Sequence, residues 1–571
     1  MRWDYREHSA EATAELSQSL GLAPELAEWL IRQGISHSET ARSFLYPRLA
    51  QLEDPFAVTQ LEAGVDRLLR AMQGGERIVI LGDYDVDGVT SITLLVSFLR
   101  QFSVTVDFVV PRRLEEGYGL SETVVERIVA DCAPDLLIAL DCGTNAVAPV
   151  AVLRAQGIDV LIIDHHRCKA EGLPRDCILI NPHVWDVDSE PWVNACTVGL
   201  VFKFVHGVLK KLRASGDELA FKLKLRDYLD LVALGTIADI VPLQGENRLM
   251  ARYGLEQLRN TQRAGVRALM EVSGLHHDHV VQPTDIGFRI GPRINASGRL
   301  ADAALPVRLL LSQDPQFCRK AAAQLESFNR ERQSIERSMC QQAEQMVERE
   351  QMDSPAIVVW DPDWHPGVVG IVASRLARKY RRVSIVLGAE DSLAKGSGRS
   401  IPGISLTQLF KHCDHLLSAW GGHPMAVGVS LESEHVKAFR QSLNRALETV
   451  LADTTLAEQS LEIAAWLRPQ QLGVALLEQL DLLGPFGEGN PEPVFGMRDV
   501  VLEETPRPFG SGHFRFAING DNGIRTPGIA WSKGSELPPA NQPLRMAIKL
   551  NWNQWNGQRY PQVELIDWKL G

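Results

Sequence analysis

The feature that most constrains the fold is an alternation of short apolar runs with helical patterns between residues 60 and about 245. The runs are rich in Val, Ile and Leu, which is typical of buried strands. The patterns between them, such as residues 90–101 and 122–131, fit the helices that connect parallel strands. This βαβ rhythm predicts an α/β fold with helices on both faces of a parallel sheet. The candidate strands are residues 78–81, 104–110, 136–140, 160–163 and 177–180.

Polar residues follow three of these runs. The first run leads into Asp83, Asp85 and Asp87, another into Asp141, and a third into residues 164–166 (Asp-His-His). The carboxyl ends of strands in an open α/β sheet form one edge, where ligands bind. Carboxylates this close repel one another unless a cation offsets the repulsion. We therefore predict a site for hard divalent metals, Mg²⁺ or Mn²⁺, and an acidic turn is the alternative for the first cluster taken alone.

Side chains from separate segments can complete such a site. Carboxylates and imidazole together suit Mn²⁺ or Mg²⁺ better than a structural zinc, which favours thiolates. Two ions bridged by a carboxylate form a clamp for the attacking and leaving oxygens of phosphoester hydrolysis. The sequence contains no Cys-x-x-Cys pair, no Gly-x-Ser-x-Gly and no Walker motif. The predicted ligands are Asp85, Asp87, Asp141, His165 and Asp230.

The rest of the chain divides into further units. A stretch without Gly or Pro predicts one helix of about 35 residues, a connector between lobes, with a coiled coil as the alternative. Two Gly-rich loops follow in an α/β context, and short alternating runs near the end predict a small β-barrel. We predict a helical region at 1–55, the catalytic domain at 56–315, the connecting helix at 316–351, a smaller α/β domain at 352–452 and an OB-like barrel at 453–571.

Composition limits the class of protein. A net charge of −12 argues mildly against extended duplex binding, because nucleic-acid proteins usually carry a basic footprint. Bound ions would add charge that this count omits, so a narrow groove for nucleic acid stays possible. No apolar run is long enough to span a membrane, and the first residues do not resemble a secretory signal. The eight scattered cysteines indicate a reducing cytoplasm.

Four ordered motifs resemble those of the DHH phosphoesterase superfamily: residues 83–88, 141–143, 164–166 and 230–236. The loop at 421–423 (Gly-Gly-His) resembles the associated DHHA1 domain. Within the superfamily the chain is most similar to the RecJ family of single-strand-specific exonucleases, over nearly its whole length. Supporting stretches include residues 116–120, 291–299, 364–371, 396–402 and 485–491, the last reading Pro-Phe-Gly-Glu-Gly-Asn-Pro.

The resemblance implies roles for particular residues. It implies that the five predicted ligands bind metal, with Asp141 bridging the two ions. It also implies that His166 faces the scissile phosphate. Asp83 is implied as a ligand or as an orienting group. One departure is Leu81, which stands where some relatives carry a ligating His. The implied substrate-binding residues are Arg293, Asn295, Arg299, Ser397, Arg399, Gly421, Gly422 and His423.

For function, the resemblance implies 5′-to-3′ removal of mononucleotides from single-stranded DNA in repair and recombination, with two Mn²⁺ or Mg²⁺ ions. It also suggests a single-strand-binding protein and a RecQ-type helicase as partners, and we expect a monomer. A cleft between two α/β lobes would admit one strand and exclude a duplex. Two alternatives stay open: a DHH-type phosphatase or oligonucleotidase for small substrates, and a non-catalytic replication scaffold.

Several residues have simpler interpretations. Asp239 follows Asp230 at an offset that need not share its helix face, so we expect it to cap the helix or to be solvated. A structural role is expected for His365, and a solvated turn for His276, His277 and His279. The aromatic residues of the barrel either stack on bases or belong to its core. These are Trp531, Trp552, Trp555 and Tyr560.

Overall fold

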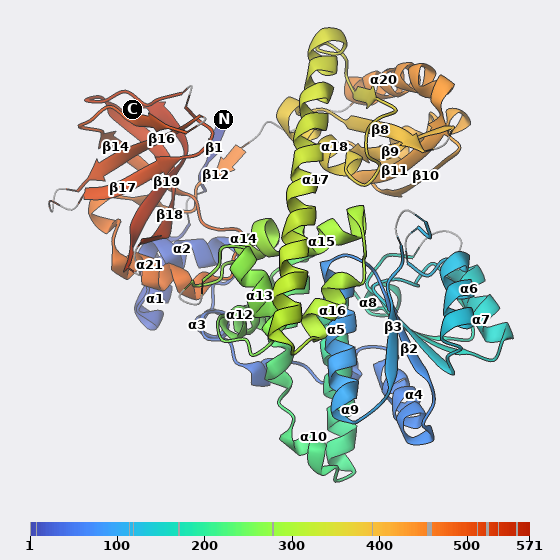
Figure 1. Ribbon diagram of the computed structural model, residues 1–571. Helices are drawn as coiled ribbons and strands as arrows, with labels where there is room; N and C mark the ends of the chain where they lie inside the picture. The colour runs from blue at the N-terminus through green and yellow to red at the C-terminus, as the bar shows by residue number, and fades with distance from the viewer. Residues whose placement is uncertain are drawn as a thin grey trace.

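The protein has three lobes, two of which are connected by one long helix (Figure 1). The computed structural model describes the whole chain except residues 1, 7, 113–114, 118, 169–171, 277–278, 391, 454–459, 511, 521–522, 524, 535 and 556–557, and the side chains of residues 390, 453 and 555. The long helix is α17 (Pro315–Glu350), whose 36 residues rise about 54 Å. It runs from the catalytic lobe to the smaller α/β lobe, as the Gly- and Pro-free stretch predicted.

The catalytic lobe is built on a sheet of five strands in the order β3-β2-β4-β5-β6. Every neighbouring pair is parallel, which confirms the α/β prediction. Residues of alternate parity along each strand point to opposite faces, so Ile78 and Ile80 join one core and Val79 and Leu81 another. The strands are β2 (Ile78–Gly82), β3 (Val106–Val109), β4 (Leu136–Leu140), β5 (Asp159–Ile163) and β6 (Ile178–Ile180).

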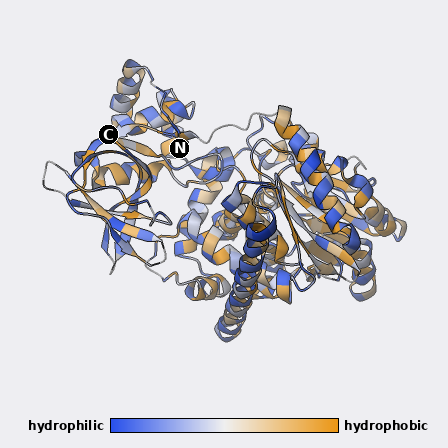
Figure 2. Ribbon diagram, turned by 90° about the horizontal axis from the view of Figure 1, so that it is seen from above, coloured by the Kyte–Doolittle hydropathy of each residue, from blue (hydrophilic) through white to orange (hydrophobic). Residues whose placement is uncertain are grey.

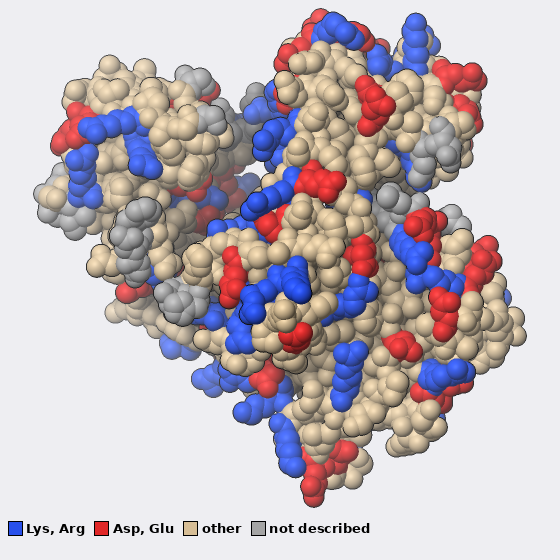
Figure 3. Space-filling model, viewed as in Figure 1, with Lys and Arg blue, Asp and Glu red and all other residues tan. Residues whose placement is uncertain are grey.

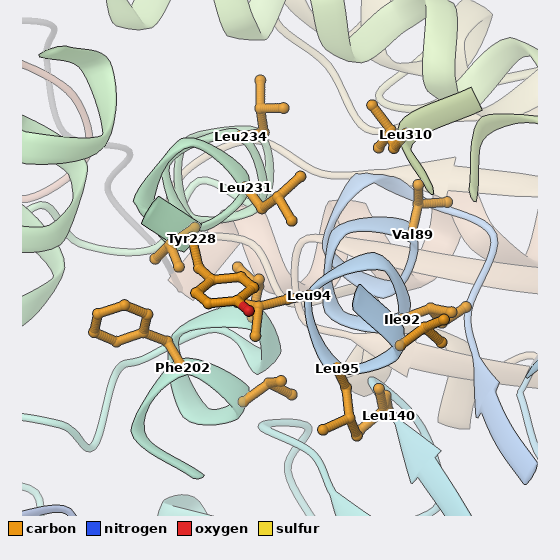
Figure 4. Packing of buried hydrophobic residues seen from close by; sticks show 14 of the residues in the cluster. Val89, Ile92, Leu94, Leu95, Leu140, Phe202, Tyr228, Leu231, Leu234 and Leu310 are labelled. Carbon is orange, nitrogen blue, oxygen red and sulfur yellow. The ribbon is translucent and has the colours of Figure 1, made fainter. Parts of the chain in front are cut away.

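Helices cover both faces of this sheet. The larger core lies under α4, α5, α9 and α11, where Leu95 packs near Leu140 of the sheet and Phe202 lies beside Tyr228 (Figure 4). The smaller core lies under α6 and α7. The covering helices are α4 (Leu61–Gly74), α5 (Val86–Gln101), α6 (Glu122–Asp131), α7 (Val147–Ala155), α9 (Thr197–Ala214) and α11 (Leu229–Ala238).

A helical layer joins the sheet to α17. Residues 287–299 are rich in Gly and Arg, a composition typical of a loop, but they form a π-helical turn, η4, followed by α15. Pro292 stands in the first turn, where its missing N–H costs nothing, and Gly298 lets the helix approach Tyr84. This layer contains α12 (Gly245–Arg259), α13 (Ala264–Val272), α14 (Pro283–Asp285), η4 (Ile286–Ile290), α15 (Gly291–Leu300) and α16 (Leu305–Leu311).

The smaller α/β lobe carries a sheet in the order β10-β11-β9-β8-β7, antiparallel except for β7 with β8. Its two predicted Gly-rich loops are strands, because glycine allows the backbones to approach closely. A Cβ on Gly396 would lie 2.0 Å from the carbonyl of Val386. The elements are β7 (Ile357–Trp360), α18 (Val369–Tyr380), β8 (Ser384–Glu390), β9 (Leu393–Arg399), α19 (Leu406–Lys411), β10 (Ala419–His423), β11 (Ala426–Glu432) and α20 (Val436–Asp453).

The third lobe unites the two ends of the chain. Its seven-stranded sheet has the order β13-β14-β18-β19-β17-β16-β15 and shares one core with the N-terminal helices α1 (Ala10–Leu20), α2 (Pro24–Arg32) and α3 (Ser38–Leu45). We call this lobe the OB unit. Its other elements are β1 (Arg2–Asp4), β12 (Ser460–Glu462), β13 (Trp466–Leu467), α21 (Val474–Leu483), β14 (Phe495–Val501), β15 (Arg507–Phe509), β16 (His513–Asn519), β17 (Arg525–Ala530), β18 (Pro543–Trp555) and β19 (Gln558–Leu570).

The surface carries charged side chains of both signs, and the helices carry polar residues beside their apolar ones (Figure 2, Figure 3). Most helices carry both hydrophilic and hydrophobic residues (Figure 2), as expected when one face of a helix packs on a core. Acidic and basic side chains are intermixed on the face seen in Figure 3, where a notch separates the OB unit from the smaller α/β lobe. None of the helices in the described part of the chain is long and apolar enough to cross a membrane.

Candidate metal centre and substrate cleft

The polar residues that follow β2, β4 and β5 meet at one edge of the parallel sheet, as predicted. Helix N-termini hold two of them in place. The Asp85 side chain caps α5 by accepting from the backbone N–H groups of Asp87 and Gly88 at 3.0 and 3.1 Å. Both oxygens of Asp87 accept from the first N–H groups of α9, those of Thr197 and Val198, at 2.7 and 2.8 Å. These donors fix the direction of both carboxylates.

Three overlapping groups of possible ligands lie at this edge. In each group the ligand atoms lie within 4.8 Å of one another. His165 Nε2 is 3.4 Å from Asp141 Oδ1 and 3.6 Å from Asp239 Oδ2. Asp141 belongs to two of the groups, as a bridging ligand would. The groups are Asp83 with Asp85 and Asp141; Asp141 with His165 and His166; and Asp87 with His165 and Asp239.

The protonation behaviour of these acids fits a cation site. Burial, together with repulsion from Asp85, raises the pKa of Asp87 to about 7. Burial and the charges of Asp87 and Asp85 raise the pKa of Asp239 to about 8, and the same causes raise that of Asp141 well above its usual value. Buried carboxylates that repel one another in this way are stabilised by hard cations with oxygen and imidazole ligands. The residues therefore fit two Mn²⁺ or Mg²⁺ ions.

Asp164 and His166 form a separate pair within the centre. Asp164 is fully buried and accepts from the N–H groups of Thr144 and His165 and, at 2.7 Å, from Nδ1 of His166. Burial opposes the charge on His166, but the Asp164 carboxylate raises the pKa of His166 to about 9. The pKa of His165 is lowered to about 4 by burial and by the nearby His166. One imidazole is therefore neutral and available as a ligand, whereas the other carries a proton at neutral pH.

The main correction to the sequence analysis is that the predicted ligand Asp230 does not lie in any of these ligand groups. It lies at the first turn of α11, where it accepts from the Thr261 hydroxyl at 2.7 Å and pairs with Arg263 at 3.3 Å. Asp239, which we expected to cap or be solvated, caps the opposite end of the same helix and faces His165. Nine residues of helix separate the two acids by about 13 Å, so they cannot share a site. Asp239 takes the place that the sequence analysis gave to Asp230.

Leu81 has a structural role. Its side chain is fully buried and packs in the smaller core with Val79 and Ala139, beneath α6 and α7. The position therefore faces apolar residues, and the ligand that some relatives carry there has no counterpart at this position.

A cavity of about 850 Å³ separates the metal centre from the smaller α/β lobe. Tyr84, which lies between Asp83 and Asp85, forms part of its wall. Four of the predicted substrate-binding residues line the opposite wall, and His423 is exposed at the end of β10. The Arg399 guanidinium is held by the Ser397 hydroxyl at 2.5 Å and the Gly398 carbonyl at 2.8 Å. The four residues are Ser397, Arg399, Gly421 and Gly422.

The three candidates on α15 have different surroundings. Arg299 lines the same cavity and donates to the Gly367 carbonyl at 2.8 Å, which links the two lobes. Asn295 lines a smaller pocket beside Ala238, and its buried side-chain oxygen has no hydrogen-bond partner among the described residues. Arg293 pairs with Glu326 of α17 at 2.7 Å and is mostly buried, which indicates an anchoring role rather than contact with substrate.

The remaining candidates are mostly structural. His365 Nδ1 accepts from the Gly367 N–H at 3.0 Å, and His279 pairs with Asp285 at 2.7 Å. His277 and the side chain of Trp555 lie outside the described residues. In the OB unit, Trp552 is fixed by Asp481, whereas Trp531 is half exposed and packs edge-on against Phe509 and His513. Tyr560 is partly exposed and accepts from Asn553 at 2.9 Å.

Three family models match the chain in the order of its lobes. Residues 77–236 match the DHH family N-terminal domain, residues 353–449 the DHHA1 domain and residues 463–567 the RecJ OB domain. The first match ends at Thr236, so Asp239 lies just beyond it.

Curated relatives agree along almost the full length. The single-stranded-DNA-specific exonuclease RecJ of Bacillus subtilis is 36% identical over 99% of this chain and 70% of its own length. The protein of the same name from Escherichia coli is 34% identical over 89% of both chains. Among solved structures, RecJ from Thermus thermophilus in complex with Mn²⁺ matches with a TM-score of 0.83 and 28% identity, over 100% of this chain and 80% of that one.

Proposed function

Because the chain belongs to the RecJ family of single-stranded-DNA-specific exonucleases, we propose that it degrades single-stranded DNA in the 5′-to-3′ direction and releases mononucleotides. The observation that carries this proposal is the position of Tyr84. It lies between two acids of the metal centre and also lines the cavity toward the smaller α/β lobe. A strand in the cavity would thus contact the residue that lies between two of these acids.

The side chains divide into two ligand sets. Asp83, Asp85 and Asp141 would hold one Mn²⁺ or Mg²⁺ ion, and Asp87, His165 and Asp239 the other, with Asp141 close to both. When bound, two such ions supply an activated water and charge stabilisation for phosphodiester hydrolysis. This assignment keeps four of the five ligands expected from the sequence and replaces Asp230 with Asp239.

His166 supplies a fixed positive charge. Its proton is retained at neutral pH because Asp164 raises its pKa to about 9. The ring is about one-third exposed and its Nδ1 is 4.0 Å from Asp141 Oδ1, so it faces the reacting region. We assign it to the scissile phosphate. The attraction between the imidazolium and the phosphate becomes stronger as negative charge develops on the phosphate in the transition state.

The cleft accounts for the preference for single strands. Backbone donors, Ser397, Arg399 and Arg299 line it, and such groups contact phosphate without reading sequence. Its two walls belong to different lobes that the Arg299–Gly367 hydrogen bond holds together, and in this proposal one strand passes between them. The exposed Trp531 in the OB unit offers a stacking surface for bases farther along the strand.

The cellular setting is part of the proposal. We place the enzyme in the cytoplasm as a monomer that works in DNA repair and recombination beside a single-strand-binding protein and a RecQ-type helicase. The eight cysteines all lie in the described part of the chain and none forms a disulfide, which is consistent with a reducing compartment.

A labelled-strand assay tests the function. Oligonucleotides labelled at the 5′ or the 3′ end are digested with Mn²⁺, and the Asp141→Ala protein is the control. Release of mononucleotides from the 5′ end supports the proposal. Cleavage restricted to dinucleotides or pyrophosphate indicates the small-substrate phosphatase, and binding without cleavage indicates the scaffold. Undiminished cleavage by the Asp141→Ala protein contradicts the assignment of the site.

A further inference from the structure

The segment after Asp239 is strained and needs support. Ile240 adopts a left-handed backbone with φ of 61°, and its side chain is 69% exposed. A β-branched residue in this region is costly and persists only where its surroundings hold it. Residues 240–244 form this segment, which connects Asp239 at the end of α11 to the start of α12.

A loop of the OB unit contacts this segment. The loop comprises residues 484–490 and includes most of the Pro-Phe-Gly-Glu-Gly-Asn-Pro motif, for which the proposed function gives no role. Gly487 and Asn490 pair through both backbone hydrogen bonds, at 3.0 and 3.2 Å. The buried Asn490 side chain donates to the carbonyls of Leu483 and Pro485. These internal bonds fix the shape of the loop before it meets the catalytic lobe.

The contact is tight and involves the backbone of both partners. The Leu243 N–H donates to the Glu488 carbonyl at 2.7 Å, and the Gln244 side chain donates to the Gly489 carbonyl at 2.8 Å. A Cβ on Gly487 would lie 2.8 Å from the side chain of Leu243. Gly489 has φ of 69°, and its Cβ would lie 3.0 Å from Pro242. Gly489 is therefore needed for the loop to approach the segment, and Gly487 leaves the space that the buried Leu243 side chain occupies.

Helix α12 binds the start of the same loop through Arg248. Arg248, which is 4% exposed, donates to the carbonyls of Leu482, Leu483 and Gly484 at 3.1, 3.0 and 2.8 Å and stacks on Phe44 at 3.6 Å. The first two carbonyls end helix α21, where the helix dipole favours a cation. The loop is thus held from both sides of the segment.

A second connection reaches Asp87. The buried Asn247 side chain donates to the carbonyls of Pro242 and Asn194, at 3.1 and 2.7 Å. Asn194 lies just before α9, whose first N–H groups hold the Asp87 carboxylate. The segment at 240–244 and the start of α9 are therefore supported by the same helix, α12.

We propose that residues 484–490 of the OB unit are a positioning element for the metal centre. By holding residues 240–244 they fix Asp239 in its place beside His165. This inference rests on the proposed function, since it requires that Asp239 ligates a metal ion. It predicts that metal affinity at the catalytic edge depends on a contact made by a lobe that supplies no ligand.

The Gly487→Ala substitution in the full chain tests the proposal. The added methyl pushes against Leu243, so Mn²⁺ affinity measured by calorimetry should fall at least fivefold. Leu243→Val shortens the obstructing side chain, and the double variant should return to within twofold of the unmodified protein. Binding of a single-stranded oligonucleotide in EDTA should stay unchanged in all variants, because none of the substituted residues lines the cavity.

Gly473→Ala is the matched control, since a Cβ there meets nothing within 4 Å and the residue lies in the same unit. Unchanged Mn²⁺ affinity in Gly487→Ala overturns the inference, as does failure of the Leu243→Val rescue. Absence of Mn²⁺ binding by the unmodified protein overturns the proposed function instead. If Gly487→Ala does not fold, Gln244→Leu removes only the hydrogen bond to Gly489 and should weaken Mn²⁺ about twofold; no change there also overturns the inference.

Discussion

The two ends of helix α11 carry acids with opposite roles. Asp230 lies in the first turn, where the helix dipole favours a negative charge, and it is satisfied by Thr261 and Arg263. Asp239 lies at the C-terminal end, where the dipole disfavours it, and its neighbours include Asp87 and Asp85. The charge of Asp230 is stabilised by protein groups, whereas the charge of Asp239 is disfavoured by burial and by its acidic neighbours. An acid that the fold itself destabilises therefore marks the functional end of the helix.

The same substitution at each end should separate these roles. Asp239→Asn should lower kcat by about 10³-fold, because loss of a metal ligand removes several kcal/mol of transition-state stabilisation. It should also remove one class of Mn²⁺ site in calorimetry. An Asp239→Asn enzyme that keeps both sites and full activity would contradict the ligand assignment.

Asp230→Asn should have the reverse profile. The change leaves Arg263 mostly buried without its counter-charge, so the free energy of unfolding should fall by about 3 kcal/mol. Activity at a temperature well below the melting point should stay within threefold of the unmodified enzyme. Chemical denaturation and the labelled-strand assay measure the two quantities on one preparation. A large loss of activity without a loss of stability would restore Asp230 as a functional residue.

This pair also explains what the sequence could and could not reveal. The strand positions, the parallel sheet and the acids that end strands were predictable, because periodicity and strand-end position are local signals. Asp230 and Asp239 stand at the two ends of one helix, and spacing alone cannot say which end faces the sheet edge. The signal that was available is the dipole argument: a negative charge at a helix C-terminus is disfavoured, which makes an Asp there a candidate for binding a cation.

Other features depended on contacts between distant segments. Gly396 is of a type common in loops, but it lies in a strand. Glycine is required there because the carbonyl of Val386 lies too close for any side chain. The contact of Leu243 with Glu488 joins residues about 245 positions apart, and no local pattern encodes it. Arg293 was predicted to bind substrate, and its pairing with Glu326 of α17 is a contact between distant segments that the sequence does not reveal.

Repulsion at the functional end should also appear as a pH effect on the metal-free protein. The unfolded carboxylates are ionised by pH 6.5, but Asp87 and Asp239 in the fold lose their protons only near pH 7 and 8. Raising the pH from 6.5 to 8.5 therefore removes protons from the folded state alone and destabilises it. The loss of the His166 proton, near pH 9, acts in the same direction.

We expect the melting temperature in EDTA to fall by a few degrees between these pH values. Saturating Mn²⁺ should abolish the fall, and Asp239→Asn should reduce it, whereas other titrating groups would contribute equally to both proteins. A melting temperature that rises over this range would mean that the acids do not repel one another in the fold. The same conclusion would follow if the melting temperature of the Asp239→Asn protein fell as much as that of the unmodified protein.

Asp164 sharpens the comparison because it lies at the metal centre like Asp239 but is paired with a protein group like Asp230. It neither requires a cation nor serves stability alone, since its partner is His166 of the centre. In Asp164→Asn the pKa of His166 should fall from about 9 toward its ordinary value of 6.5, which NMR titration of the metal-free protein measures. Activity at pH 8 should then drop about tenfold, because the imidazole is neutral there, and should partly recover at pH 6. Equal losses at both pH values would mean that Asp164 acts by binding the backbone N–H groups of Thr144 and His165, and not by maintaining the charge of His166.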